Sequence, residues 1–388
     1  MKLFTTAEKA VFRTRPNRFV ITCLLNGKPV MAYLPNPGRL WELLLPGVTV
    51  LLVRQPGTSA RMRYIAVAVE KKGVPIFLHT HLNNAVARYL IENNRVPGLE
   101  GAAVVRPEVT AGKSRFDFLL LHGGREVLLE VKSCTLFSGT IGMFPDAETL
   151  RGRKHLLELA SQSGMSRRGA VLVLVHSPGV RFFLPEYHTD LGFARALLSV
   201  SDRIMVRALS VGWNRDLSLA KNTKNLFIPW GLIRDEAQDR GSYIIVLHLR
   251  RTRRITAGSL GAVLFRQGYY LYVGSAQKNL SKRIARHQRK RKNHFWHIDH
   301  LREAADFVAA LPVRSGDDLE CRIAASLQKI SGWHIPRFGS SDCVCASHLC
   351  AMTDNPLRSP SFIDMLMYFR IDRLAERAAA CCSAHEGP

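Results

Sequence analysis

Apolar and polar residues alternate in short runs over the first 80 residues, which is the pattern of β-strands buried on one face. Two such runs, 18–25 and 28–34, flank the dipeptide Asn26-Gly27, a strong signal for a two-residue hairpin turn. Further strands are predicted at 48–54, 61–70 and 74–80. About five short strands fit a small barrel of the oligonucleotide-binding kind, and a generic β-sandwich is the alternative.

From residue 83 onward the pattern changes to a mixture of helical and extended segments. Helices with a 3.6-residue apolar period are predicted at 84–94, 151–163 and 193–200. Strands are predicted at 104–109, 116–121, 127–132, 170–176 and 204–209. The order α-β-β-β-α-β predicts a mixed α/β domain around a central sheet.

A further unit begins near residue 240, with strands predicted at 243–249 and 268–273 and helices at 279–292 and 318–331. The chain is long enough for two or three domains, each with its own core. We therefore expect α/β and α+β architecture in this order: 1–82, barrel; 83–212, α/β domain; 213–239, linker or extension of the first half; 240–352, α+β domain; 353–388, helical or disordered tail.

One predicted hairpin carries candidate chemistry. Two glycines at 123–124 lie between apolar runs and predict a two-residue turn whose flanking residues pair. Counting outward places Asp117 opposite Glu130, where like charges roughly 4.5–5.5 Å apart repel each other. Lys132 shares the face of Glu130, because side chains alternate along a strand. Two carboxylates and an amine between apolar strands suit a divalent cation that neutralises the acids and activates water.

Composition adds a partner to this picture. The chain is 47% hydrophobic, as globular proteins are, but its formal net charge is +24. Such a charge predicts a polyanionic partner, with DNA first and RNA not excluded; a basic proteome or an anionic membrane surface is the alternative. No run approaches the ~18 apolar residues of a membrane span, and the eight cysteines form no secreted disulfide pattern. We therefore expect a cytoplasmic protein without a membrane partner, and composition does not reveal its oligomeric state.

Several motifs of the first half closely resemble the sugar fermentation stimulation protein A family. They are Arg15-Pro-Asn-Arg-Phe19, Leu34-Pro-Asn-Pro-Gly-Arg-Leu40, Ser114-Arg-Phe-Asp-Phe118, Glu130-Val-Lys-Ser133 and Phe144-Pro-Asp-Ala-Glu-Thr-Leu-Arg-Gly-Arg-Lys-His-Leu156. The resemblance covers about residues 4–212. It implies an oligonucleotide-binding-like barrel followed by a PD-(D/E)XK nuclease-like domain that binds DNA. Asp117 and Glu130 would hold Mg²⁺ or Mn²⁺, and Lys132 would orient or deprotonate the attacking water.

The same half supplies candidate nucleic-acid contacts. The loop 35–39 is either a phosphate contact or a plain turn, since Pro and Gly punctuate it. The basic start of the helix at 151–163 adds charge where backbone N–H groups attract phosphate, and solvated surface charge is the alternative. His155 fits a phosphate contact as well as it fits chemistry. The candidate contacts in this half are Arg18, Asn36, Arg39, Arg115, Arg151, Lys154 and His155.

The second half resembles the GIY-YIG endonuclease superfamily, closest to an uncharacterised branch. Gly241-Ser-Tyr243 and Tyr272-Val-Gly274 match the two short strands for which that superfamily is named, and the match covers roughly 240–352. The resemblance implies that Tyr243 and Tyr272 position or activate the nucleophile, Arg283 stabilises the phosphate, and Glu320 binds Mg²⁺. Without the resemblance, both tyrosines would be read as core aromatics.

Two further groups belong to this half. Basic residues are dense between 240 and 292, and they predict contacts with nucleic-acid phosphates; a solvated helix surface is the alternative. The candidate contacts in this half are Arg286, His287, Lys290 and Arg291. Cys343, Cys345 and His348, with Cys321 upstream, are soft ligands at close range. Their spacing is not the C-x₂₋₄-C of ordinary zinc sites, so a buried turn with inert thiols is favoured and Zn²⁺ is the alternative.

These observations predict a DNA-binding, metal-dependent endonuclease for repair or processing. The alternative is a non-catalytic DNA-binding transcriptional regulator that retains nuclease folds. The complete candidate catalytic sets favour catalysis, because a regulator could lose them without penalty. The sequence leaves the substrate, the cut position and the cooperation of the two sites open.

Overall fold

The computed structural model describes residues 1–55 and 62–384, so Arg61, where one predicted strand begins, lies outside the described residues. The chain forms two compact units. Unit 1 contains Met1–Glu186, Gly192–Ile233 and Leu374–Pro388; unit 2 contains Tyr187–Leu191 and Arg234–Arg373.

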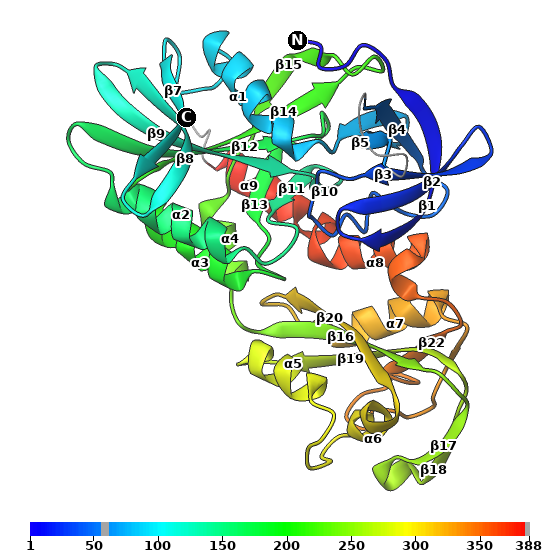
Figure 1. Cartoon of the computed structure of the whole chain (residues 1–388). Helices are drawn as coiled ribbons and strands as arrows, with labels where there is room; N and C mark the ends of the chain where they lie inside the picture. The colour runs from blue at the N-terminus through cyan, green and yellow to red at the C-terminus, as the bar shows by residue number, and fades with distance from the viewer. Residues whose placement is uncertain (56–61, 385–388) are drawn as a thin grey trace. The chain divides into compact units, whose positions relative to one another are not determined.

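Unit 1 begins with a closed barrel (Figure 1). Its strands are β1 (Glu8–Asn17), β2 (Val20–Leu25), β3 (Lys28–Tyr33), β4 (Thr49–Arg54), β5 (Tyr64–Lys71) and β6 (Val74–Phe77). They pair in the order β3-β2-β1-β4-β5-β6, and a β3–β5 pairing closes β1 to β5 into a ring. The hairpin at Asn26-Gly27 is confirmed, since Leu25 pairs with Lys28. The barrel interpretation is therefore correct, and β1 is the strand that the pattern missed.

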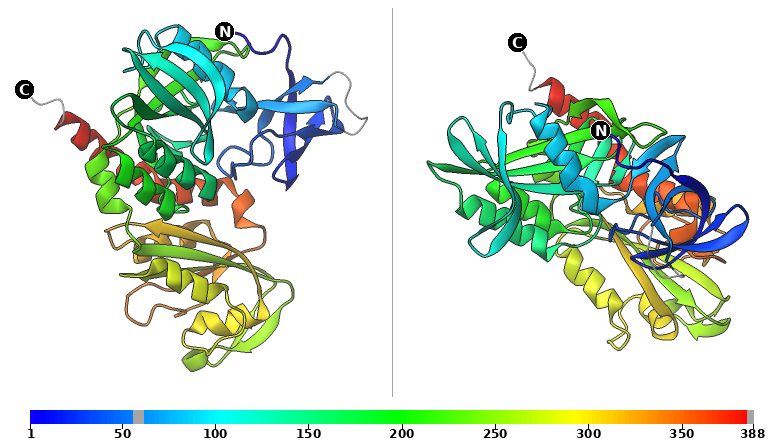
Figure 2. Two further views of the ribbon diagram at one scale, coloured as in Figure 1. Left: turned by 60° about the vertical axis from the view of Figure 1, so that its left-hand side comes forward. Right: turned by 45° about the horizontal axis from the view of Figure 1, so that its top comes forward.

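The rest of unit 1 is built on a six-stranded sheet with helices on both faces (Figure 2). Its order is β15-β14-β12-β9-β8-β7, with β12 parallel to both β9 and β14. A small sheet, β10-β11-β13, lies outside the predicted strands. The strands are β7 (Ala103–Ala111), β8 (Ser114–His122), β9 (Arg125–Cys134), β10 (Leu136–Ser138), β11 (Ile141–Phe144), β12 (Arg167–Val175), β13 (Phe182–Pro185), β14 (Met205–Trp213) and β15 (Leu219–Asn225).

Helix α1 (Asn83–Glu92) packs on one face of this sheet, and α2 (Leu150–Ser161) and α3 (Leu191–Val200) pack on the other. The further helices are α4 (Trp230–Glu236, at the border with unit 2) and α9 (Ala375–Ser383). The mixed α/β order is confirmed. Of the two alternatives for 213–239, the extension of the first half fits and the linker does not, because this segment contributes β15, which pairs with β14, and α4.

Alternation along β9 assigns its side chains to the two faces. Val127, Leu129 and Val131 pack with the apolar side chains of α1. Leu128 packs in the other core, with those of α2 and α3. Glu130 and Lys132 have the same parity as Leu128, so they face the side of the sheet that α2 covers.

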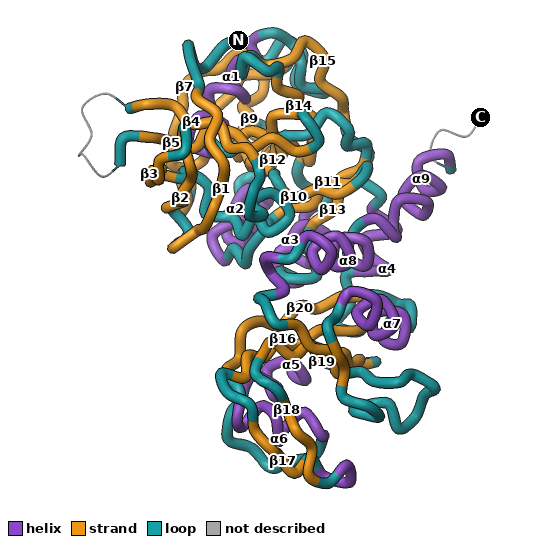
Figure 3. The backbone as a smooth tube through the Cα atoms, turned by 90° about the vertical axis from the view of Figure 1, so that its right-hand side faces the viewer, coloured by secondary structure: helices purple, strands orange, loops and turns teal. Residues whose placement is uncertain are grey.

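Unit 2 is a five-stranded sheet with the order β20-β16-β19-β22-β21, next to a β17-β18 hairpin (Figure 3). Alternate side chains of β16 pack with α5 and α6, while α7 packs on β19 and β22. Within the described residues, no helix is long and apolar enough to span a membrane. The elements of unit 2 are β16 (Gly241–Leu249), β17 (Arg253–Thr256), β18 (Ala262–Phe265), β19 (Gly268–Ala276), α5 (Leu280–Gln288), α6 (His297–Ala304), β20 (Asp306–Arg314), α7 (Glu320–Ile330), β21 (Trp333–His334), β22 (Leu349–Met352) and α8 (Pro360–Arg370).

Candidate functional site

The predicted acidic pair lies where strands β8 and β9 separate. Their ladder runs from the hairpin turn to the pair Phe118–Leu129, one step short of Asp117 and Glu130. The alternation of faces breaks here, because Phe116 packs with the α2 cluster and Phe118 with the α1 cluster although they are two residues apart. The Asp117 carboxylate turns between the strands, where it accepts the backbone N–H of Val131 at 2.7 Å.

Asp117 is also held from the helix α1. Its Oδ1 accepts a hydrogen bond from Asn84 Nδ2 at 2.7 Å. Burial raises the pKa of Asp117, and the nearby carboxylate of Glu130 raises it further. Because each acid disfavours ionisation of the other, a cation between them would lower the energy of the fully ionised pair.

Glu130 is 5% exposed and is surrounded by donors on one side. Its Oε1 accepts from Lys132 Nζ at 2.5 Å and from His155 Nδ1 at 2.7 Å. Its Oε2 is buried and has no hydrogen-bond partner among the described residues. Burial raises the pKa of Glu130, but the hydrogen bond from His155 and the charge of Lys132 outweigh it, so the pKa is lowered.

The donor set at this fork fits a hard divalent cation. Carboxylate oxygens are what Mg²⁺ and Mn²⁺ prefer, and a buried carboxylate oxygen without a hydrogen bond costs free energy unless a ligand satisfies it. Glu130 Oε2 is such an atom. The Asp117 carboxylate is held close to it by the backbone N–H of Val131, the residue that follows Glu130 on β9. Exposed Glu108, by contrast, forms an ion pair with Arg115 at 3.6 Å.

A cavity of about 430 Å³ lies between the barrel loop at 36–38 and the segment 133–149, which begins one residue after Lys132. Asn36 lines it, with Oδ1 accepting the N–H of Gly38 at 3.0 Å. Ser133, which follows Lys132 on β9, lines it from the other side. The cavity is therefore shared by the barrel and the α/β sheet.

Arg39 joins these two parts of unit 1 instead of facing solvent. Its Nε donates to the carbonyl oxygen of Asp146 at 2.5 Å, and its Nη2 lies 3.8 Å from Glu186 Oε2. Nearby Glu42 is buried, and burial raises its pKa to about 8; repulsion from Asp146 adds to the rise, and Lys71 and Arg39 oppose it. Arg39 is thus bound to a largely buried group of acids, and its predicted phosphate contact stays a prediction.

The remaining predicted nucleic-acid contacts divide by exposure. His155 is 5% exposed and His287 is 2% exposed, and both are bonded inside the protein, so direct phosphate contact does not fit them. Arg286 forms a bidentate pair with buried Asp299 at 3.0–3.2 Å, which leaves it a structural partner. The exposed members are Arg18, Arg115, Arg151, Lys154, Lys290 and Arg291.

In unit 2 the four predicted catalytic residues line one cavity of about 330 Å³. Tyr243 on β16 and Tyr272 on β19 have ring centroids 6.4 Å apart. Arg283 Nη1 donates to the carbonyl oxygen of Ser275 at 2.8 Å, and the Ser275 hydroxyl donates to Glu320 Oε2. The topology thus brings together residues from two strands and two helices.

Both phenols of this cavity are protonated groups. Burial raises the pKa of Tyr243 and of Tyr272 well above the ordinary value. Burial lowers the pKa of His287 to about 3, and its neutral ring bonds the Tyr243 hydroxyl through Nε2 at 2.9 Å. Tyr243 and His287 are therefore joined as neutral groups by one buried hydrogen bond.

Cys321, Cys343, Cys345 and His348 also come together, with their ligand atoms within 4.8 Å of one another. The expectation of inert buried thiols does not fit, because Cys321 is exposed and Cys343 and Cys345 are half-buried. His348 Nδ1 donates to Glu320 Oε1 at 2.9 Å.

Two supporting residues escaped the pattern analysis. Asn84 contacts Asp117 from 33 positions upstream, and its only signal was its place at the start of a helix next to the sheet. Asp299 is fully buried among basic residues. The one feature of the sequence that pointed to it is that it is the first acidic residue after Asp239. Burial and the hydrogen bonds from Arg286 and Lys292 act in opposite directions on Asp299, and the donors win, so its pKa is lowered.

Comparisons with known proteins divide the chain at about residue 216. The family model "SfsA N-terminal OB domain" matches residues 14–78, and "Sugar fermentation stimulation protein RE domain" matches 81–216. "Domain of unknown function DUF123" matches 242–367. That description does not name GIY-YIG, so this resemblance stays a prediction.

Similar proteins cover the first half. A sugar fermentation stimulation protein homolog of Clostridium botulinum (strain Loch Maree / Type A3) is 38% identical over 198 residues, which are 51% of this chain and 86% of the relative. One from Methanothermobacter thermautotrophicus is 34% identical over 183 residues, 47% of this chain and 76% of the relative. The solved structure of Pyrococcus furiosus SfsA in complex with Ca²⁺ is 27% identical, covers 59% of this chain and 99% of its own, and has a TM-score of 0.54.

Proposed function

The chain belongs to the sugar fermentation stimulation protein family, and we propose that it is a metal-dependent nuclease that acts on DNA. The observation that carries this proposal is the buried, unsatisfied Oε2 of Glu130 beside the Asp117 carboxylate and the Lys132 ammonium. The Ca²⁺ complex of the Pyrococcus furiosus relative supports a hard-cation site in this family.

Asp117 and Glu130 would hold Mg²⁺ or Mn²⁺. The ion would supply Lewis-acid stabilisation of the charge that develops on the phosphodiester. Asn84 and the Val131 N–H keep the Asp117 oxygens at the fork, and His155 holds Glu130 Oε1 so that Oε2 points away from the helix α2. Lys132, at 2.5 Å from Glu130, orients the attacking water by donating a hydrogen bond.

Water oxygen forms the new bond to phosphorus, and the bond from phosphorus to one sugar oxygen breaks. The products are one phosphomonoester end and one hydroxyl end. The net charge of +24 supports a polyanionic substrate, since its electrostatic attraction does not depend on base sequence. Exposed Arg18 at the cavity rim, with Arg151 at the start of α2, supports a strand path along the shared cavity.

We propose a second hydrolytic site in unit 2, on the GIY-YIG resemblance and on the convergence of its predicted residues around one cavity. Arg283 would stabilise the phosphate and Glu320 would bind Mg²⁺. The raised pKa of Tyr243 supports a role in hydrogen bonding, with neutral His287 holding the Tyr243 hydroxyl in place. Cleavage of opposite strands by the two sites is one use of this arrangement.

The test is hydrolysis of single-stranded, duplex and branched DNA, and of RNA, by the full chain with Mg²⁺ or Mn²⁺. We expect Asp117→Asn to abolish cutting at the first site and Glu320→Gln to abolish cutting at the second. The matched controls are Glu108→Gln and Glu303→Gln, which change exposed acids in the same units. Tight DNA binding without cutting in either metal, unchanged in both site variants, would decide for a DNA-binding regulator.

A further inference from the structure

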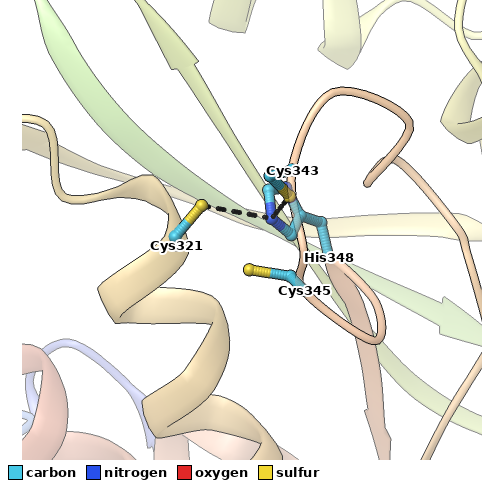
Figure 4. A group of neighbouring side chains, drawn as sticks. All are labelled: Cys321, Cys343, Cys345 and His348. Atoms are coloured by element: carbon cyan, nitrogen blue, oxygen red, sulfur yellow. Dashed lines mark hydrogen bonds between the residues drawn. The ribbon is translucent and has the colours of Figure 1, made fainter.

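The loop that follows β21 in unit 2 carries a cluster of soft ligands that the proposed hydrolysis does not use. Cys321 is the second residue of helix α7, while Cys343, Cys345 and His348 lie in or directly after the loop before β22 (Figure 4). Val344 between the two cysteines is fully exposed, so its neighbours Cys343 and Cys345 turn inward. Four donors from two segments therefore face one point.

The spacing of these donors is close to that of a tetrahedral metal shell. His348 Nε2 lies 3.4 Å from Cys343 Sγ and 4.0 Å from Cys321 Sγ. With Zn–S of about 2.3 Å and Zn–N of about 2.0–2.1 Å, donors around zinc lie about 3.5–3.8 Å apart. Cys321, Cys343 and Cys345 are free cysteines, so no disulfide competes for these sulfurs.

The histidine is oriented as metal-ligating histidines are. His348 is 2% exposed, and its Nδ1 donates to Glu320 Oε1 at 2.9 Å. Because Nδ1 carries the hydrogen, Nε2 keeps its lone pair and directs it toward the sulfurs. A carboxylate that fixes the far nitrogen of the imidazole is the usual support of a zinc-bound histidine.

We propose that Cys321, Cys343, Cys345 and His348 bind one structural zinc ion. Three thiolates and one imidazole form a closed Cys₃His set, which selects zinc over the hard cations that carboxylates prefer. The sequence spacing concealed this site, because only two of the three cysteines are neighbours in the chain and the third comes from a helix.

The ion would brace a loop that has little other support. The described segment 339–347 contains no helix or strand. Its neck is closed by backbone hydrogen bonds from His348 N–H to Phe338 at 2.9 Å and from Arg337 N–H to Ala346 at 2.8 Å. Gly339, Ser341 and Asp342 of this loop line the same cavity as Glu320. Zinc would thereby hold one wall of the cavity and, through His348, the Glu320 carboxylate.

The test is the metal content of the full chain, purified without chelators and measured by mass spectrometry. We expect one equivalent of zinc in the wild type and in Cys381→Ser, a control in unit 1, and its loss in Cys343→Ser and in Cys345→Ser. X-ray absorption at the zinc edge of the wild type should show sulfur and nitrogen neighbours in a 3:1 ratio, and this readout requires no variant to fold.

Three results would overturn the proposal: wild-type chain that neither contains zinc nor takes up added Zn²⁺, zinc retained in both cysteine variants, or a shell of oxygen ligands. None of these readouts depends on DNA cleavage, so the zinc site and the proposed nuclease activity can fail separately.

Discussion

Replacing His155 by alanine removes the one buried donor that reaches Glu130 from helix α2. The ring Nδ1–H donates to Glu130 Oε1 at 2.7 Å, and Nε2 accepts from Arg151 Nε at 3.3 Å, which fixes the tautomer. His155 makes no contact of its own with the expected cation or phosphate. Its loss should therefore loosen Glu130 without removing a ligand.

The expected size of the effect follows from two independent estimates. A hydrogen bond to a charged group contributes about 1.5–3 kcal/mol. Removal of a residue that hydrogen-bonds to a metal ligand typically lowers the metal affinity or the activity 10–100-fold. Since a factor of ten is about 1.4 kcal/mol, the two estimates agree. We expect 10–100-fold weaker Mn²⁺ binding, with hydrolysis largely restored at saturating metal.

The assay is Mn²⁺ titration followed by electron paramagnetic resonance, beside hydrolysis rates over a range of metal concentrations. His155→Asn keeps a donor near the position of Nδ1 and should recover most of the affinity, which a purely structural role would not predict. His122→Ala, at the hairpin turn, is the control. Mn²⁺ affinity of His155→Ala within twofold of the wild type would refute the reasoning.

Three further predictions address stability and binding. Arg39→Ala removes the positively charged partner of largely buried Asp146 and should cost about 3–5 kcal/mol in the free energy of unfolding by urea, whereas unchanged stability would contradict a stabilising charge network. Burial raises the pKa of Glu42 to about 8, above its unfolded value, so stability should fall as the pH rises from about 4.5 through 8, by at most roughly 5 kcal/mol. Glu42→Gln should flatten that pH profile in chemical denaturation. Lys290→Ala with Arg291→Ala should lower the slope of log affinity against log salt by about 1.8 if both contact duplex phosphates, and an unchanged slope would place DNA elsewhere.

Local patterns predicted the hairpin of β8 and β9 and the pairing next to its turn, because side-chain alternation and turn chemistry act over a few residues. They missed β1 and the small sheet β10-β11-β13. β1 and β11 each pair with one neighbouring strand and with one distant strand, β4 and β13, and a local pattern does not contain the distant partner. They left 213–239 open between a linker and an extension of the first half, since the polar sequence of β15 is stabilised only by pairing with the buried β14.

The sequence by itself determined which chemical groups are available: the Asp117, Glu130 and Lys132 trio, the excess of positive charge, and the thiols near residue 345. Only the tertiary structure decided that Asn84 and His155 hold the two acids, that Arg39 binds Asp146, that His287 is buried, and that Cys321 joins the loop ligands. The physical reason is that these contacts form when whole elements pack to bury apolar surface. Packing of that kind depends on the complete set of faces, which no short segment specifies.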